Sequence, residues 1–184
     1  VSAPEPQKQE IDKAKLGSSV NEFFEATDGW GTNDDKTMEA LRNARTPEER
    51  AYFRKRYQEK TGETVGQRLQ KELSGNALKE AQYLQDGKFA DAAMVGLEES
   101  LGTLNDNEDK IRNIMENLTP ADLKELKGKK GWGELQKKVE SHLGGTDLDH
   151  FKALVDGDQV GAAVADLDAA MGSSKSWYNL SHLG

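Results

Sequence analysis

Cysteine is absent from this chain, proline occurs only four times, and no apolar run approaches the about 20 residues that a membrane-spanning helix needs. Without cysteine, disulfides, thiolate catalysis and cysteine-ligated zinc are excluded. The chain also lacks the basic stripe with interleaved aromatic residues that is typical of nucleic-acid-binding surfaces, and its net charge is −8. We therefore expect no nucleic-acid partner and no transmembrane segment. The protein is expected to be soluble or peripherally membrane-associated.

Catalytic patterns are missing as well. The three histidines, at 142, 150 and 182, are dispersed along the chain. No Ser-His-Asp set, phosphate-binding loop or pair of catalytic carboxylates stands out, and paired acids recur on helix faces expected to be solvated. We expect that the protein is not an enzyme and that its histidines bind no metal.

Helix signals follow one another along most of the sequence, and no segment has the period-two alternation of a strand. Val1 to about Lys15 combine two prolines with mixed charges and are expected to form a disordered tail, residues 1–15. Beyond it, glycines, N-caps and prolines predict five short helices near residues 18–27, 33–43, 47–60, 64–74 and 76–85. Thr32 is expected to cap the second helix, with Asp35 near its third position, and Thr46-Pro47 to begin the third. Thr119-Pro120 is expected to begin a later helix in the same way.

The chain repeats its apolar pattern with a step of 70 residues. The matched positions are Val65, Leu69 and Leu73 with Leu135, Val139 and Leu143; Leu78, Ala81 and Leu84 with Leu148, Phe151 and Leu154; and Met94, Leu97 and Leu101 with Val164, Leu167 and Met171. Asp86-Gly87 likewise becomes Asp156-Gly157. We expect an all-α protein with repeat units at 16–87 and 88–157 and the truncated start of a third at 158–184.

A glycine turn in the first unit, Gly29-Trp30-Gly31-Thr32, is paired with a distant carboxylate at Glu72. Calcium takes about six to eight oxygen ligands, commonly backbone carbonyls, water and a bidentate carboxylate. Glycine lets the backbone turn its carbonyls inward, and Glu72 would supply the carboxylate if its helix end lies beside the turn. The alternative is a helix-capping turn that needs glycine only for its geometry, with Glu72 a solvated surface charge.

Together these motifs resemble the annexin repeat, whose signature is Gly-x-Gly-Thr followed about 38 residues later by Asp or Glu; here 39 residues intervene. The resemblance covers about residues 17–171. It implies five-helix repeats in a right-handed superhelix and calcium-dependent attachment to acidic phospholipid. The ligands that it implies are the carbonyls of Thr27, Gly29 and Gly31 and the carboxylate of Glu72, with Thr32 and Asp35 at a weaker, secondary site and Trp30 contacting the membrane.

The chain departs from the annexin pattern in its second and third units, and most annexins carry four repeats. Ser100 stands in place of Gly29, three extra residues enter around Leu104-Asn105-Asp106, and His142 stands in place of Glu72. The second site is therefore expected to be inactive unless Glu140 or Asp147 substitutes. Degenerate repeats also occur in large bacterial proteins, so the alternative function is a helical scaffold that binds a protein partner or self-associates.

Overall fold

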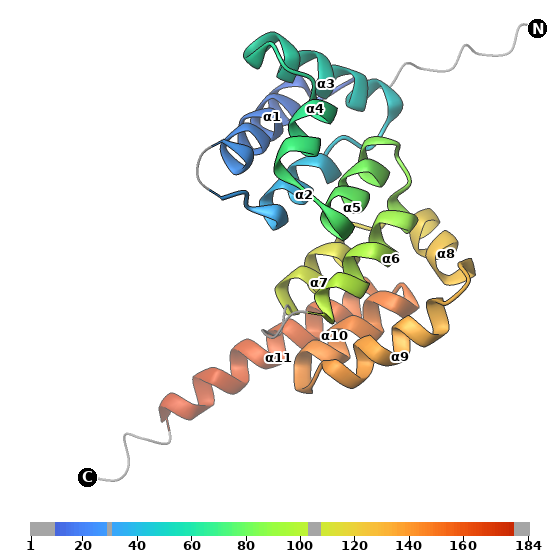
Figure 1. Ribbon diagram of the computed structural model, residues 1–184. Helices are drawn as coiled ribbons and strands as arrows, with labels where there is room; N and C mark the ends of the chain where they lie inside the picture. Colours follow the sequence, from blue (N-terminus) through green and yellow to red (C-terminus); the bar gives the residue numbers. More distant parts are fainter. Residues whose placement is uncertain (1–9, 29–30, 103–107, 179–184) are drawn as a thin grey trace, which may run out of the picture.

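The computed structural model describes residues 10–28, 31–102 and 108–178, and within these residues the chain forms eleven α-helices and no strand (Figure 1). The helices are α1 (Lys13–Thr27), α2 (Asp34–Arg42), α3 (Pro47–Thr61), α4 (Val65–Glu72), α5 (Gly75–Gln85), α6 (Phe89–Ser100), α7 (Glu108–Glu116), α8 (Pro120–Gly128), α9 (Trp132–His142), α10 (Gly145–Asp156) and α11 (Gln159–Tyr178). The all-α prediction is confirmed. None of the described helices is long and apolar enough to cross a bilayer.

The helices gather into two bodies, α1–α5 and α6–α10, and α11 projects away from the second body (Figure 1). One hydrophobic core draws its buried side chains from residues between Leu16 and Ala92. The other draws them from residues between Ala90 and Ala162. Because α6 contributes side chains to both cores, it holds the two bodies together.

Within the first body, α1 packs against α2 and α3, α2 packs against α5, and α4 lies between α3 and α5. In the second body, α6 packs against α7, α8 and α9, while α10 packs against α7 and α9. The two remaining large contacts join α5 to α6 and α10 to α11. We call these contacts the first and the second junction.

Helix starts follow local capping chemistry. Thr46 and Thr119 each form the predicted cap before a proline, and each is completed as a capping box by Glu49 or Asp122. At the start of α2 the prediction was wrong, because Asn33 and not Thr32 is the N-cap, and its side chain accepts a hydrogen bond from the Lys36 amide at 3.0 Å. Asparagine is at least as good a cap as threonine, so the helix begins one residue later.

The first helix begins at Lys13, earlier than the predicted residue 18. Asp12 acts as its N-cap and accepts a hydrogen bond from the Lys15 amide at 2.9 Å. The end of the expected tail is therefore helical, because an aspartate cap outweighs the unfavourable composition around it. Residues 1–9 lie outside the part of the chain that the structure describes.

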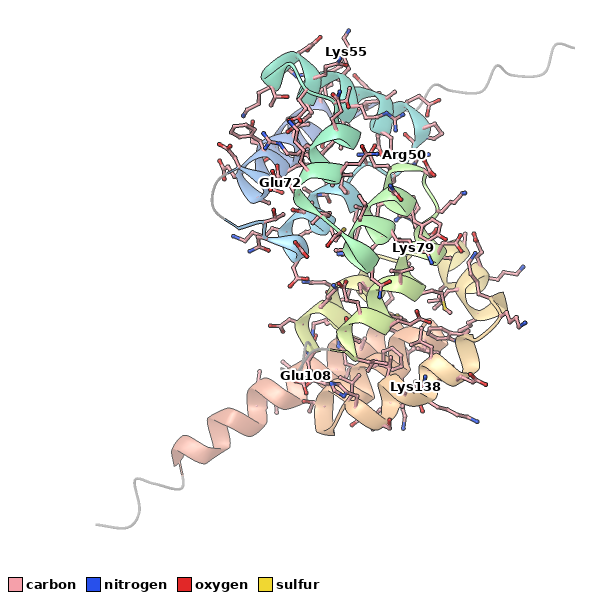
Figure 2. All side chains as sticks on the ribbon, viewed as in Figure 1. Arg50, Lys55, Glu72, Lys79, Glu108 and Lys138 are labelled. Carbon is pink, nitrogen blue, oxygen red and sulfur yellow. The ribbon has the colours of Figure 1, made fainter. Side chains whose placement is uncertain are left out.

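Charged side chains cover the outside of both bodies, as Lys55 and Lys138 illustrate in Figure 2. The first junction is an exception. There Glu80 of α5 is fully buried and accepts a hydrogen bond from Arg42 at 2.6 Å, with the Lys110 ammonium 3.8 Å away. Burial raises the pKa of Glu80, and the positive charges of Arg42 and Lys110 oppose that rise.

Candidate metal site

The loop between α1 and α2 begins after Thr27, where Asp28 has an extended backbone. Gly31 has a φ of +89°, a left-handed conformation that favours glycine, and the Asn33 amide donates to the Ala26 carbonyl at 3.0 Å. This hydrogen bond closes the loop across the end of α1. Gly29 and Trp30, a predicted ligand and the predicted membrane contact, lie outside the described residues.

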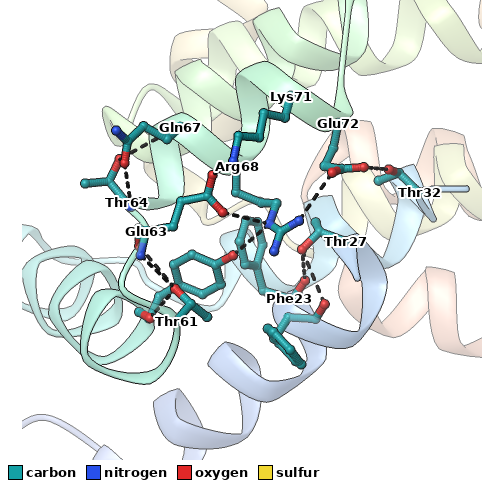
Figure 3. Close-up of polar contacts among 12 residues, drawn as sticks. Phe23, Thr27, Thr32, Thr61, Glu63, Thr64, Gln67, Arg68, Lys71 and Glu72 are labelled. Atoms are coloured by element: carbon teal, nitrogen blue, oxygen red, sulfur yellow. Dashed lines mark hydrogen bonds and ion pairs between the residues drawn. The ribbon is translucent and has the colours of Figure 1, made fainter. Parts of the chain in front are cut away.

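The distant carboxylate reaches this loop. Glu72 is the last residue of α4, and its Oε2 accepts a hydrogen bond from the Thr32 hydroxyl at 2.9 Å (Figure 3). The two residues are 40 positions apart in the sequence. Since Asn33 caps α2, the Thr32 side chain is available for this contact. The helix end that carries Glu72 therefore lies beside the turn, as the calcium hypothesis requires.

The other predicted ligands are placed differently. The Thr27 side chain is buried and its hydroxyl donates to the Phe23 carbonyl at 2.8 Å, so only the main chain of Thr27 can serve the loop. Asp35 lies in the first turn of α2, where its Oδ1 is 3.8 Å from the Lys110 ammonium. The structure thus brings Thr32 together with Glu72, whereas Asp35 faces Lys110 of α7.

A fixed cation lies next to the Glu72 carboxylate. Arg68, one turn earlier on α4, donates a hydrogen bond to Glu72 Oε1 at 3.3 Å (Figure 3). It also donates to the Tyr57 hydroxyl at 3.0 Å, and its Nε lies 3.2 Å from Glu63 Oε2. The hydrogen bond to Tyr57 is the largest contribution to a raised Arg68 pKa, and burial opposes it. The hydrogen bond from Lys71 lowers the pKa of Glu63. Any calcium bound at Glu72 would share that carboxylate with Arg68.

In the second body, the described residue that matches Glu72 by the 70-residue step is His142, the last residue of α9. Ser100 ends α6 with its hydroxyl donating to the Gly96 carbonyl at 2.7 Å, and residues 103–107 lie outside the described part of the chain. Of the two substitutes considered, Glu140 accepts from Gln136 at 2.7 Å and Asp147 accepts from Arg112 at 3.0 Å. Both acids are therefore engaged on their own helices or with α7.

Sequence reasoning missed a second group of metal-ligand type. Glu116 of α7, His150 of α10 and Asp166 of α11 have one potential ligand atom each within 4.8 Å of one another. The buried His150 ring lies between the two acids, with Nε2 3.1 Å from Glu116 and Nδ1 3.0 Å from Asp166. The three residues are far apart in the sequence, and no motif or spacing there indicates that they meet.

An arginine competes for this second group. Arg112 donates to the same Asp166 Oδ1 at 2.7 Å that faces the His150 ring. As arranged, the group is an ion-pair cluster that holds α11 against α7 and α10, and a metal would have to displace Arg112 from it. The loop between α1 and α2, with Glu72 of α4 beside it, is therefore the stronger candidate.

No protein-family model matches this chain, and no curated protein sequence matches it.

Proposed function

We propose that the protein binds calcium at the loop between α1 and α2 and, through that ion, attaches to acidic phospholipid. The observation that carries the proposal is the 2.9 Å hydrogen bond between Thr32 and Glu72, which places a carboxylate beside a turn whose Gly31 is left-handed. The remaining ligands in this proposal are carbonyl oxygens of Thr27, Gly29 and Gly31, which suit a hard cation such as calcium.

An annexin-like repeat arrangement is part of the proposal, and three kinds of observation support it. In the first body α1 packs on α2 and α3, and α2 packs on α5. In the second body α6 packs in the same way on α7 and α8, and α7 packs on α10. Gly75 and Gly145, related by the 70-residue step, begin α5 and α10 with φ values of +56° and +53°. Gly87 and Gly157, related by the same step, have φ values of +72° and +77°. Equivalent helices therefore begin and end through the same backbone conformations.

Bound calcium would explain how a chain of net charge −8 reaches an acidic surface. A loop that supplies one carboxylate and a few carbonyls leaves coordination positions for phosphate oxygens, since calcium takes about six to eight ligands. The ion then bridges the Glu72 carboxylate and the lipid headgroup. Without it, the two negative surfaces repel each other.

Sedimentation with phosphatidylserine vesicles tests this proposal. The protein should pellet with the vesicles at about 1 mM calcium, in the range of weak extracellular sites, and should stay in the supernatant after chelation. Vesicles of phosphatidylcholine alone should not retain it. Equal amounts in the pellet with and without calcium would overturn the proposal.

Two variants identify the ligand, and a third controls for charge. Glu72→Gln should abolish the calcium-dependent pellet while preserving helicity by circular dichroism. Arg68→Gln should tighten calcium binding about 3- to 10-fold, because it removes a positive charge beside Glu72. Glu134→Gln, which neutralises an exposed acid on α9, should leave calcium binding unchanged. A titration of Glu72→Gln identical to that of the unsubstituted chain would show that the ligand assignment is wrong.

A helical scaffold that binds a protein is the second candidate, and α11 favours it. Val160, Val164, Leu167 and Met171 are spaced along one side of this helix and are 75%, 50%, 59% and 47% exposed. Exposed apolar stripes of this kind commonly mark protein contacts. Calorimetry separates the two candidates: heat of binding on addition of calcium supports the membrane function, and no heat leaves the scaffold.

A further inference from the structure

An open apolar hollow lies beside the second junction. It has a volume of about 620 Å³ and lies among α7, α8, α10 and the start of α11. Its apolar lining consists of Met115, Leu118, Pro120, Leu123 and Leu154. Volumes of about 300–1,000 Å³ with a mainly apolar lining are typical of small-molecule sites.

A much smaller space lies at the first junction. It measures only about 10 Å³, and Phe89, which is 7% exposed, forms part of its wall together with Leu84. The Arg45 guanidinium stacks 3.6 Å above the centre of that ring, which is the distance of a cation–π contact. At the first junction an aromatic side chain of α6 is therefore packed against α5 and covered by Arg45.

The sequence explains why the second hollow stays open. The 70-residue step pairs Leu84 with Leu154 and Phe89 with Gln159, so a leucine of the wall is kept and the aromatic ring is lost. Gln159 is exposed at the edge of the space.

Two lysines give the open hollow a charge preference. Lys124 and Lys127 of α8 line it, and both are exposed. Among the described residues neither takes part in an ion pair, in contrast to Lys129 nearby, whose ammonium is 2.8 Å from Asp91. A ligand that fits this hollow therefore combines an aromatic ring with a negative group.

We propose that the hollow formed by Met115, Leu118, Leu123 and Leu154 binds small aromatic anions, such as aromatic carboxylates. The ring of the ligand lies beside Gln159, where the 70-residue step replaces Phe89, and the anion lies against Lys124 and Lys127. This site is independent of the calcium loop, which lies on the first body.

Anilinonaphthalene sulfonate, a fluorescent aromatic anion, is a direct probe for the complete chain. We expect saturable binding of one molecule with enhanced fluorescence. 3-Phenylpropionate should displace the probe, whereas 3-phenylpropylamine, with the same ring and the opposite charge, should not. Absence of saturable binding, or equal displacement by acid and amine, would overturn the proposal.

Variants locate the bound probe. Gln159→Phe should fill the hollow and weaken binding at least 10-fold without lowering the melting temperature. The double change Lys124→Gln and Lys127→Gln should weaken it several-fold, while the same change at the exposed Lys137 and Lys138 of α9 should not. Binding that survives both sets of changes but is lost in Val164→Gln would place the probe on the apolar side of α11 and overturn the proposal.

Discussion

The two junctions of this molecule use matching positions for opposite chemistry. At the first, the buried acid Glu80 lies against Gly96 and is neutralised by cations. At the second, the 70-residue step puts His150 in place of Glu80 and Asp166 in place of Gly96, so a buried ring lies between acids. The comparison shows that one packing arrangement accommodates a buried acid among cations at one junction and a buried imidazole ring between acids at the other.

The two junctions also differ in how exposed the charged side chains beside the buried group are. Arg42 and Lys110, the cations beside Glu80, are only 8% and 7% exposed. Glu116 and Asp166, the acids beside His150, are 42% and 40% exposed. Water can therefore replace a lost partner at the second junction but not at the first.

Removing the buried polar side chain at each junction should lower the free energy of unfolding more than the other changes, and by different amounts at the two junctions. We expect Glu80→Ala to lower the free energy of unfolding by about 3–5 kcal/mol, because Arg42 is left as a buried charge without its acid. His150→Ala should cost about 1–3 kcal/mol, since its acids can be hydrated. Urea unfolding of both variants at pH 7 measures the difference, and equal costs would contradict the contrast in exposure.

A smaller effect should follow from adding one methyl group at the first junction. A Cβ at Gly96 would lie 2.7 Å from Glu80 Oε1 and 2.8 Å from Ile114 Cδ1. We expect Gly96→Ala to destabilise the protein by about 1–3 kcal/mol, although alanine is the better helix former. Gly133→Ala on α9, where a Cβ meets nothing within 4 Å, is the matched control and should be neutral or stabilising. Stabilisation by Gly96→Ala would show that Glu80 is free to move aside.

Local sequence signals could predict much of the fold. Threonine and proline at 46–47 and 119–120 predicted two helix starts, and the spacing of Leu135, Val139 and Leu143 predicted buried positions that are indeed buried. Capping and periodicity act within a few residues, so a sequence displays them directly. One exception was the α2 cap, where Asn33 and Thr32 are adjacent and both are suitable. The other was the start of α1, where Asp12 caps the helix earlier than expected.

Tertiary polar contacts were harder to predict. The approach of Glu72 to the loop was expected only because the motif resembled a known repeat. Periodicity assigns charged residues to solvent, so nothing in the sequence indicated that Glu80 and Arg42 would be buried together. The His150 group was missed for the same reason, because its members come from three helices and meet only when α11 packs.

The pH dependence of stability at the first junction should give the subtlest effect, and its sign decides which force dominates there. Burial raises the native pKa of Glu80 above its ordinary value of 4.5, despite Arg42 and Lys110. Between the unfolded and the native pKa, the folded protein binds more protons than the unfolded chain, so the stability that Glu80 contributes falls as pH rises.

Glu80→Gln isolates the contribution that titration of Glu80 makes to stability, because glutamine keeps the shape and the acceptor for Arg42 but does not titrate. In urea unfolding from pH 4 to pH 8, the stability of the unsubstituted protein relative to Glu80→Gln should decrease as pH rises. An increase would mean that the attraction of Arg42 and Lys110 outweighs burial, and the first junction would then be held together by its ion pairs. A decrease would mean that apolar packing holds it and that Glu80 remains there at a cost in stability.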